Sequence, residues 1–303
     1  MKKLLFLLFC GTPLFAQDDL LDMLEKEDAK KITYTQATFK GSRLINGQTI
    51  ETIAKQHLNF WISHRFGAVN SGFINNFFGL DEARIRLGLE YGLTDDWLIG
   101  AGRSSIEKTY DVYSKYKIIK QSNRIPLTIS LYGGASTNTM NSGFTMESGT
   151  VMHYSNDLQR QSYVGQVLFA RKFDDKLSLQ LMPTFLHNNK AESASFDNNQ
   201  IAIGLGGRYK LTNRLSISVE YYKNLVDKKA YLAKAGATYP YQDALSLGFD
   251  IETGGHVFQL HFSNSRGMIE KHFIGQTLGS WDNGDIFYGF NIARTFSLEP
   301  KKK

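Results

Sequence analysis

A tetrapeptide of histidine, an aromatic residue, serine and asparagine occurs twice in this chain, at residues 153–156 and 261–264. In an extended strand, residues two apart point to the same face, so His261 and Ser263 are expected to lie side by side. An imidazole next to a hydroxyl can accept its proton and activate it as a nucleophile. His261 and Ser263 are therefore a candidate catalytic pair.

The repeated tetrapeptide resembles the His-x-Ser-Asn segment of outer-membrane acyl hydrolases, including the phospholipase A and lipid A deacylase barrels. The resemblance implies a lipid-acting hydrolase with Ser263 as nucleophile and His261 as base. The match is partial, because Ser265 stands where the phospholipase pattern has glycine. In those enzymes the pair faces the lipid, whereas here Phe258, Leu260 and Phe262 occupy the apolar face, which places His261 and Ser263 in the lumen. We therefore expect no enzymatic activity and keep the hydrolase as an alternative.

Other chemistry is not indicated by the sequence. There is no phosphate-binding glycine loop or nucleophile elbow, and the seven histidines lack metal-ligand spacing, so we expect neither a cofactor nor a metal. The single cysteine, Cys10, lies in the N-terminal segment. Five of the 35 basic residues are terminal lysines, and without them the chain is nearly balanced by its 29 acids. This balance argues against nucleic-acid binding.

The dominant pattern along the chain is strict alternation of apolar and small or polar residues. It is clear at 201–209, 215–222, 245–251 and 286–292, and a period of two over such lengths predicts β-strands. Tight turns rich in Gly, Asn and Asp are predicted at 94–96, 121–123, 174–175, 212–213 and 253–255. Between them lie long polar or glycine-rich loops at about 67–81, 104–109, 137–157, 188–199, 225–242 and 264–285.

Six long loops alternating with five tight turns give twelve strands. Outer-membrane barrels have an even number of strands, short periplasmic turns and long extracellular loops. The sequence therefore predicts an all-β fold, an antiparallel up-and-down transmembrane barrel over residues 56–296. The alternative is a soluble β-sandwich or lipocalin-like barrel, which would turn its apolar face inward.

One face of the predicted strands carries charges that would be costly next to lipid. A charge facing lipid at mid-depth costs about 2–4 kcal/mol for Arg or Lys, so we assign these side chains to the lumen. Four polar segments, 64–67, 84–86, 102–105 and 108–111, are each better explained, taken alone, by polar networks across strands, and their functional interpretation is charge selection of solutes. The assigned residues are Arg84, Arg86, Glu90, Lys115, Lys117, Glu220 and Asp250.

The two ends of the chain are expected to lie outside the barrel. Lys2 and Lys3, an apolar run at 4–9 and a small-residue site at Ala16 predict a signal peptide over 1–16, and hence export to the outer membrane. Residues 17–55 are expected to form a periplasmic N-terminal extension, either a disordered leader or a partial plug of the lumen. Residues 297–303 are expected to be a basic C-terminal tail.

Several segments together carry a second resemblance. They are 59–67, 78–81, 85–91, 102–111, 254–260 and 263–268, and they look like an uncharacterised Bacteroidota family of predicted outer-membrane β-barrels. The resemblance spans nearly the whole mature chain. It implies a barrel fold and an outer-membrane location, and it implies no chemistry.

The function predicted from these observations is a narrow pore or binding barrel for small polar solutes. A twelve-stranded barrel lies between those filled by their own side chains and those that leave an open channel. Besides the hydrolase, the other alternative is a structural or adaptor barrel that binds partners through long loops such as 137–157 and 264–285. Outer-membrane lipid is an expected partner of any such barrel, and the sequence identifies no protein partner.

Overall fold

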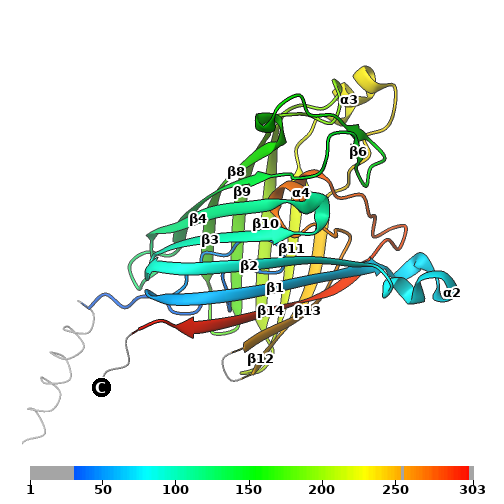
Figure 1. Cartoon of the computed structure of the whole chain (residues 1–303). Coiled ribbons are helices and arrows are strands. Elements are labelled where there is room, and N and C mark those ends of the chain that lie inside the picture. Colours follow the sequence, from blue (N-terminus) through cyan, green and yellow to red (C-terminus); the bar gives the residue numbers. More distant parts are fainter. Residues whose placement is uncertain (1–30, 254–255, 300–303) are drawn as a thin grey trace, which may run out of the picture.

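A closed antiparallel β-barrel of twelve strands dominates the computed structural model, which describes residues 31–253 and 256–299 (Figure 1). The predicted signal peptide lies outside these residues. The barrel strands are β1 (His57–Ala68), β2 (Ala83–Thr94), β3 (Trp97–Ser104), β4 (Tyr110–Ile119), β5 (Thr128–Thr137), β8 (Gln161–Lys172), β9 (Leu177–Asn188), β10 (Asn199–Lys210), β11 (Leu215–Asn224), β12 (Ala244–Thr253), β13 (His256–Ser263) and β14 (Phe287–Ser297).

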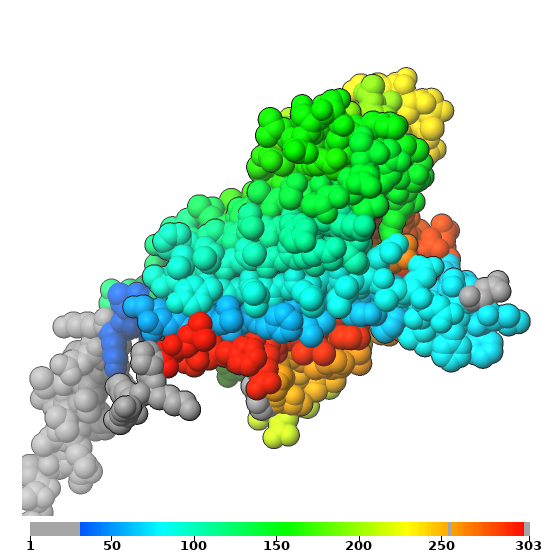
Figure 2. All heavy atoms as spheres, viewed as in Figure 1, coloured from blue at the N-terminus to red at the C-terminus, as the bar shows by residue number. Residues whose placement is uncertain are grey.

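Each barrel strand pairs with the next one along the chain, and β14 returns to pair with β1. In this closing pair His57 is opposite Ser297, and Trp61 is opposite Ala293. Figures 1 and 2 show β14, in red, lying beside β1, in blue. Because β1 begins and β14 ends at the same end, the tight turns share that end and the long loops share the other. The predicted up-and-down barrel of twelve strands is confirmed.

The side chains of the wall are arranged with the apolar face outward. On β13, Leu260 is 44% exposed while its neighbour Gln259 is 5% exposed. On β11, Val219 is 38% exposed while Glu220 is 1% exposed. A soluble β-protein would have the reverse pattern, so the soluble alternative is wrong. The burial pattern is that of a barrel whose outer surface contacts lipid and whose interior is polar.

Short elements lie in the long loops. They are η1 (Val69–Ser71), α2 (Phe73–Asn76), η2 (Phe77–Gly79), η3 (Ile106–Lys108), β6 (Phe144–Thr145), β7 (Val151–Met152), η4 (Asp157–Arg160), α3 (Lys228–Ala235) and α4 (Glu270–Gly275). The described helices are all too short or too polar to cross a membrane. Unlike α3, whose residues face outward, α4 is almost wholly buried and contacts β8, β9 and β11. The loop at 264–285 therefore folds back into the mouth of the barrel.

Candidate functional site

The interior of the barrel is occupied by part of the N-terminal extension, residues 38–50, which we call the lumen segment. Most of its residues are buried. The segment folds into a small hairpin, in which the N–H of Leu44 donates to the carbonyl of Gly47 and the N–H of Thr49 donates to that of Ser42. The extension therefore includes a section inside the barrel.

The tip of this hairpin is bound by Glu220 on β11. The backbone N–H groups of Ile45, Asn46 and Gly47 donate to its two carboxylate oxygens over 3.1, 2.9 and 3.0 Å. Three donors from consecutive residues thus converge on one buried carboxylate. Hydrogen bonds to an ionised acceptor are roughly twice as strong as neutral ones, so this contact is a major attachment of the lumen segment.

The two strands of the hairpin are joined by Lys115 on β4. Its ammonium donates to the carbonyls of Ser42 and Thr49, each over 2.8 Å, and to the side chain of Gln48 over 3.2 Å. An ammonium has three hydrogens and no acceptor, so these three contacts use its full donor capacity. Lys115 is fully buried, and the three acceptors of its ammonium all belong to the segment that it binds.

Two further acids assigned to the lumen also lie there. Glu90 accepts hydrogen bonds from Ser42 of the lumen segment over 2.6 Å, and from Asn59, Trp61 and Tyr113 of the wall. Asp250 accepts from Ser218 and Gln259 of the wall. Gln259 in turn donates to the carbonyl of Leu44 over 2.6 Å. Glu90 thus contacts the segment directly, and Asp250 acts on it through Gln259.

The remaining assigned residues differ in their surroundings. Arg86 forms a buried two-pronged ion pair with Asp111, Nε to Oδ1 at 2.9 Å and NH2 to Oδ2 at 2.5 Å. Lys117 is half-buried, and its ammonium lies 3.7 Å from Glu51. Arg84 lies at the loop end of β2 and projects into a pocket outside the lumen proper. In the sequence, the charge of Arg86, Lys117 and Arg84 does not show that one is buried in an ion pair, one is half-buried and one lies in a pocket.

The loop at 264–285 enters the barrel from the end that carries the long loops and contacts the lumen segment there. Glu270, on α4, accepts hydrogen bonds from Gln48 over 3.4 Å and from Tyr132 over 3.1 Å. The guanidinium of Arg43 lies 3.8 Å from the same carboxylate. The lumen segment and α4 are therefore in direct contact, and together they occupy the interior from both ends.

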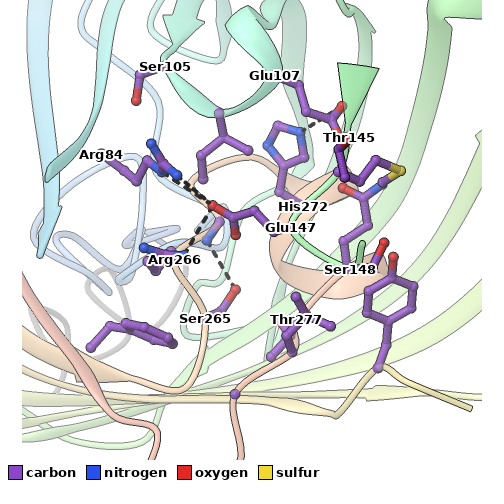
Figure 3. Close-up of a pocket in the computed structure, with 18 of the residues that line it drawn as sticks. Arg84, Ser105, Glu107, Thr145, Glu147, Ser148, Ser265, Arg266, His272 and Thr277 are labelled. Carbon is purple, nitrogen blue, oxygen red and sulfur yellow. Dashed lines mark hydrogen bonds and ion pairs between the residues drawn. The ribbon is translucent and has the colours of Figure 1, made fainter. Parts of the chain in front are cut away.

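Above α4, at the loop end of the barrel, is a pocket of about 280 Å³, which we call the vestibule pocket (Figure 3). Its walls come from the loop ends of β2 and β14, from the loops at 104–109, 137–157 and 264–285, and from Tyr241. Arg84 and Arg266 converge on Glu147, whose Oε1 lies 3.1 Å from NH2 of Arg84 and 3.3 Å from NH2 of Arg266. Arg266 also forms an ion pair with Glu82.

A second charged cluster joins η3 to α4 beside this pocket. Glu107 accepts hydrogen bonds from Lys271 over 2.9 Å and from Asn138 over 2.8 Å. Burial acts to raise the pKa of Glu107, but Lys271 and His272 together outweigh it and hold the pKa well below its usual range. Glu107 is therefore ionised at neutral pH and fixes α4 to the loop at 104–109.

The candidate catalytic pair does not form a dyad. His261 and Ser263 are both buried on the lumen face, as their strand position predicts. The hydroxyl of Ser263 accepts from Ser246 and from the N–H of Ser265, while neither ring nitrogen of His261 has a partner among the described residues. Without a hydrogen bond from serine to imidazole, the geometry gives no activated nucleophile.

Several residues that bind the lumen segment were not among the candidates from the sequence. Arg65 donates to Asn46 over 2.6 Å, and Gln180 both accepts from the N–H of Ile50 and donates to the carbonyl of Gln48. Both residues have the strand parity of the lumen face. A search for every polar residue of that parity, neutral ones included, would have found them.

Comparison with known proteins gives one family match. The model of a family described as membrane bound beta barrel domain (DUF5777) matches residues 39–296. The match thus includes nearly all of the lumen segment together with the barrel. Among curated proteins, none matches this sequence.

Solved structures of similar shape are porins and other outer-membrane barrels. NanC porin is 10% identical with a TM-score of 0.48, over 80% of this chain and 100% of that one. KdgM porin, solved in complex with disordered oligogalacturonate, is 8% identical with a TM-score of 0.47, over 79% and 99%. Omp33 of Acinetobacter baumannii is 10% identical with a TM-score of 0.39, over 82% and 100%. At these TM-scores the likenesses carry no argument about solute or mechanism.

Proposed function

Because this chain belongs to the DUF5777 family of membrane-bound β-barrel domains, we propose that it forms an outer-membrane pore for small polar solutes. In this proposal the lumen segment is a plug that closes the pore, and the pore opens when the segment leaves the barrel. The observation that carries it is the polar lumen, in which a separate piece of chain packs together with α4 and with wall side chains such as Tyr222.

The size of the barrel supports this proposal. Eight strands leave an interior that side chains alone can fill, and sixteen or more leave an aqueous channel. With twelve strands, the interior here accommodates a hairpin. The wall around it is lined by Glu90, Lys115, Gln180 and Glu220, all buried and polar. Withdrawal of the hairpin, together with displacement of α4, which it contacts through Glu270, would leave a polar passage suited to water and small polar solutes.

The attachment of the lumen segment is of a kind that can be reversed. The contacts described above are hydrogen bonds and ion pairs. A hydrogen bond exchanged for one to water changes the free energy by only about 0.5–1.5 kcal/mol. If water enters as the segment leaves, Lys115 and Glu220 form hydrogen bonds to water instead. The open state then leaves neither charge buried without a hydrogen-bond partner.

The chain position of the segment also favours movement as a unit. The stretch at 51–56 connects the lumen segment directly to β1. This stretch is attached to the wall at the end of the barrel that carries the tight turns, where Thr52 donates to the carbonyl of Asp95 over 2.6 Å. The family match begins at residue 39, which supports treating the segment and the barrel as one unit. We therefore propose that closure is part of the function of this domain. No specific contact favours the hydrolase or the adaptor alternative.

Single-channel conductance in a planar bilayer tests the proposal. The refolded chain from residue 17 is compared with a form that begins at residue 56. We expect discrete current steps from the shortened form, and a closed or much smaller conductance from the longer one. Equal conductance of the two forms, both shown to be folded by their shift on unheated gels, would contradict a plug. Silence of both folded forms would contradict a pore.

A further inference from the structure

The vestibule pocket carries more positive than negative charge. Arg84, Lys108 and Arg266 line it, against the carboxylates Glu107 and Glu147. Lys271 already pairs with Glu107, and Glu82 pairs with Arg266. Glu192 accepts hydrogen bonds from Ser148 and Tyr241 of the lining, so four cations and four acids lie in and around the pocket. The excess of positive charge is confined to the lining itself, where three cations face two acids.

Arg84 and Arg266 each have N–H donors that are not used in their contacts with Glu147 and Glu82. Both guanidiniums contact the same oxygen of Glu147, Oε1, through Nε and NH2 of Arg84 and through NH2 of Arg266. An arginine carries five N–H donors in a fixed fork that matches the oxygens of a carboxylate or phosphate. Among the described residues, NH1 of Arg84 and Nε of Arg266 have no hydrogen-bond partner. These groups can take the oxygens of a second anion.

A buried side chain in the pocket wall also lacks a hydrogen-bond partner among the described residues. His272 on α4 is 3% exposed, and neither of its ring nitrogens is hydrogen-bonded to a described residue. Its Nε2 lies 3.7 Å from Glu107, too far for a hydrogen bond. Buried polar groups in folded proteins nearly always have a partner. His272 lines the pocket, so a ligand there is within reach to supply one (Figure 3).

The remaining lining suits a polar organic molecule. Hydroxyl groups of Ser105, Ser148, Ser265 and Thr277 surround the space (Figure 3), and the ring of Phe287 lies under the guanidinium of Arg266 at 5.2 Å. Ligand sites combine an apolar or aromatic surface with a few placed polar groups. A volume of about 280 Å³ limits the ligand to a small molecule.

We infer that the vestibule pocket binds a small hydroxylated solute that carries one oxyanion, a carboxylate or a phosphate. Arg84 and Arg266 hold the anion, and the hydroxyl-bearing residues and His272 bind the remainder. The inference rests on the proposed function in one respect, which is that the solute bound here is the solute that enters the pore. The pocket lies next to α4, the helix that contacts the lumen segment, and so adjoins the closed entrance.

Binding to the refolded chain in detergent tests the inference by isothermal titration calorimetry. The probes are glucuronate, glucose 6-phosphate and glucose, which share one ring and differ in their charged group. We expect one or both charged probes to bind and glucose to bind at least about tenfold more weakly. The charged probe that binds identifies the anion as carboxylate or phosphate. Binding should weaken as salt is raised, because ions screen the contact.

Three variants locate the site. Arg84→Gln and Arg266→Gln should each weaken binding by about tenfold or more, since each removes a charged donor. Arg103→Gln removes an exposed arginine of β3 outside the pocket, and should bind as the unchanged chain does. Equal binding of glucose, no binding of any probe, or unchanged binding by both pocket variants would overturn the inference. Because this assay needs no current, failure here and failure of the pore are separate results.

Discussion

Glu220 and Asn46 lie 174 residues apart in the chain and are joined by a 2.9 Å hydrogen bond from the N–H of Asn46 to the carboxylate. The same carboxylate accepts the N–H groups of Ile45 and Gly47. A residue of the wall thus captures the tip of the N-terminal extension. The predictions below follow from this capture and from the contacts around it.

Replacing Glu220 by glutamine should loosen the lumen segment. The glutamine amide has the shape of the glutamate carboxylate but no charge. Its own N–H group would face the backbone N–H donors of the hairpin, which can form no hydrogen bond with it. The loss is about 1–3 kcal/mol, which favours the open state by roughly ten- to a hundredfold. Single-channel recordings should show more frequent opening. Asp175→Asn removes an equal charge from a side chain that is 99% exposed, in the turn between β8 and β9, and should leave the recordings unchanged; equal effects of the two would count against the capture.

Alanine at position 47 should displace the segment without altering the wall. A Cβ there would lie 2.1 Å from the hydroxyl oxygen of Tyr222, whose side chain is fully buried. At position 41 the nearest atom would be a ring carbon of Trp61, at an ordinary 3.5 Å. We expect Gly47→Ala to speed hydrogen exchange at residues 42–49, and Gly41→Ala to leave it unchanged. Equal exchange in both variants would show that the hairpin lies elsewhere.

Arg86 and Arg84 should differ in their effect on stability. Arg86→Gln leaves Asp111 buried without its partner, and breaking a buried pair costs about 3–5 kcal/mol. Arg84→Gln breaks a pair that is more than one-third exposed on both sides, worth about 0–1 kcal/mol. The urea midpoint of unfolding, followed by gel mobility, should fall clearly for the first variant and little for the second. A similar midpoint for both would contradict the burial of the Arg86 pair.

The contact between η3 and α4 should resist acid. The pKa of Glu107 is lower in the folded state than in the unfolded chain. Its stabilising contribution is therefore complete above the unfolded value, about 4.3, and is lost only as the pH falls through the lower folded value. Hydrogen exchange of α4, corrected for the intrinsic pH effect, should stay constant from about pH 7 to pH 5.

Glu107→Gln should raise the exchange of α4 at neutral pH by roughly tenfold or more, since Lys271 loses its partner. Asp157→Asn removes an acid that is 99% exposed and serves as the control. An α4 that already loosens near pH 5 in the unchanged chain would show that the Glu107 carboxylate is not held by Lys271.

The sequence predicted the barrel well because local patterns determine it. Alternation of side chains marks each strand, and residues such as Asn213 and Asp174 mark the turns, so strand number and loop lengths need no long-range information. The position of a residue along its strand, odd or even, predicted whether its side chain faces the lumen or the lipid. Lys115, Glu220 and Asp250 consequently lie inside the barrel, as does the pair His261 and Ser263.

The contents of the lumen were less predictable, for a physical reason. The lumen segment has no periodic pattern, and its position depends on partners such as Glu220, Lys115 and Glu270, which are far away in the sequence. The buried helix α4 has only six residues, too few for a helical period to be recognised. Pairing of Arg86 with Asp111 likewise requires the register of neighbouring strands, which sequence alone does not determine.

The most direct test of the central claim fixes the lumen segment in place. Asn46 and Ser246 contact each other at 3.1 Å between Nδ2 and Oγ, and both become cysteine in a Glu220→Gln chain that begins at residue 17 and therefore lacks Cys10. We predict that oxidation of this pair abolishes the single-channel currents and that reduction restores them. Currents that persist while gel mobility shows the disulfide formed would contradict a pore that opens by release of residues 38–50.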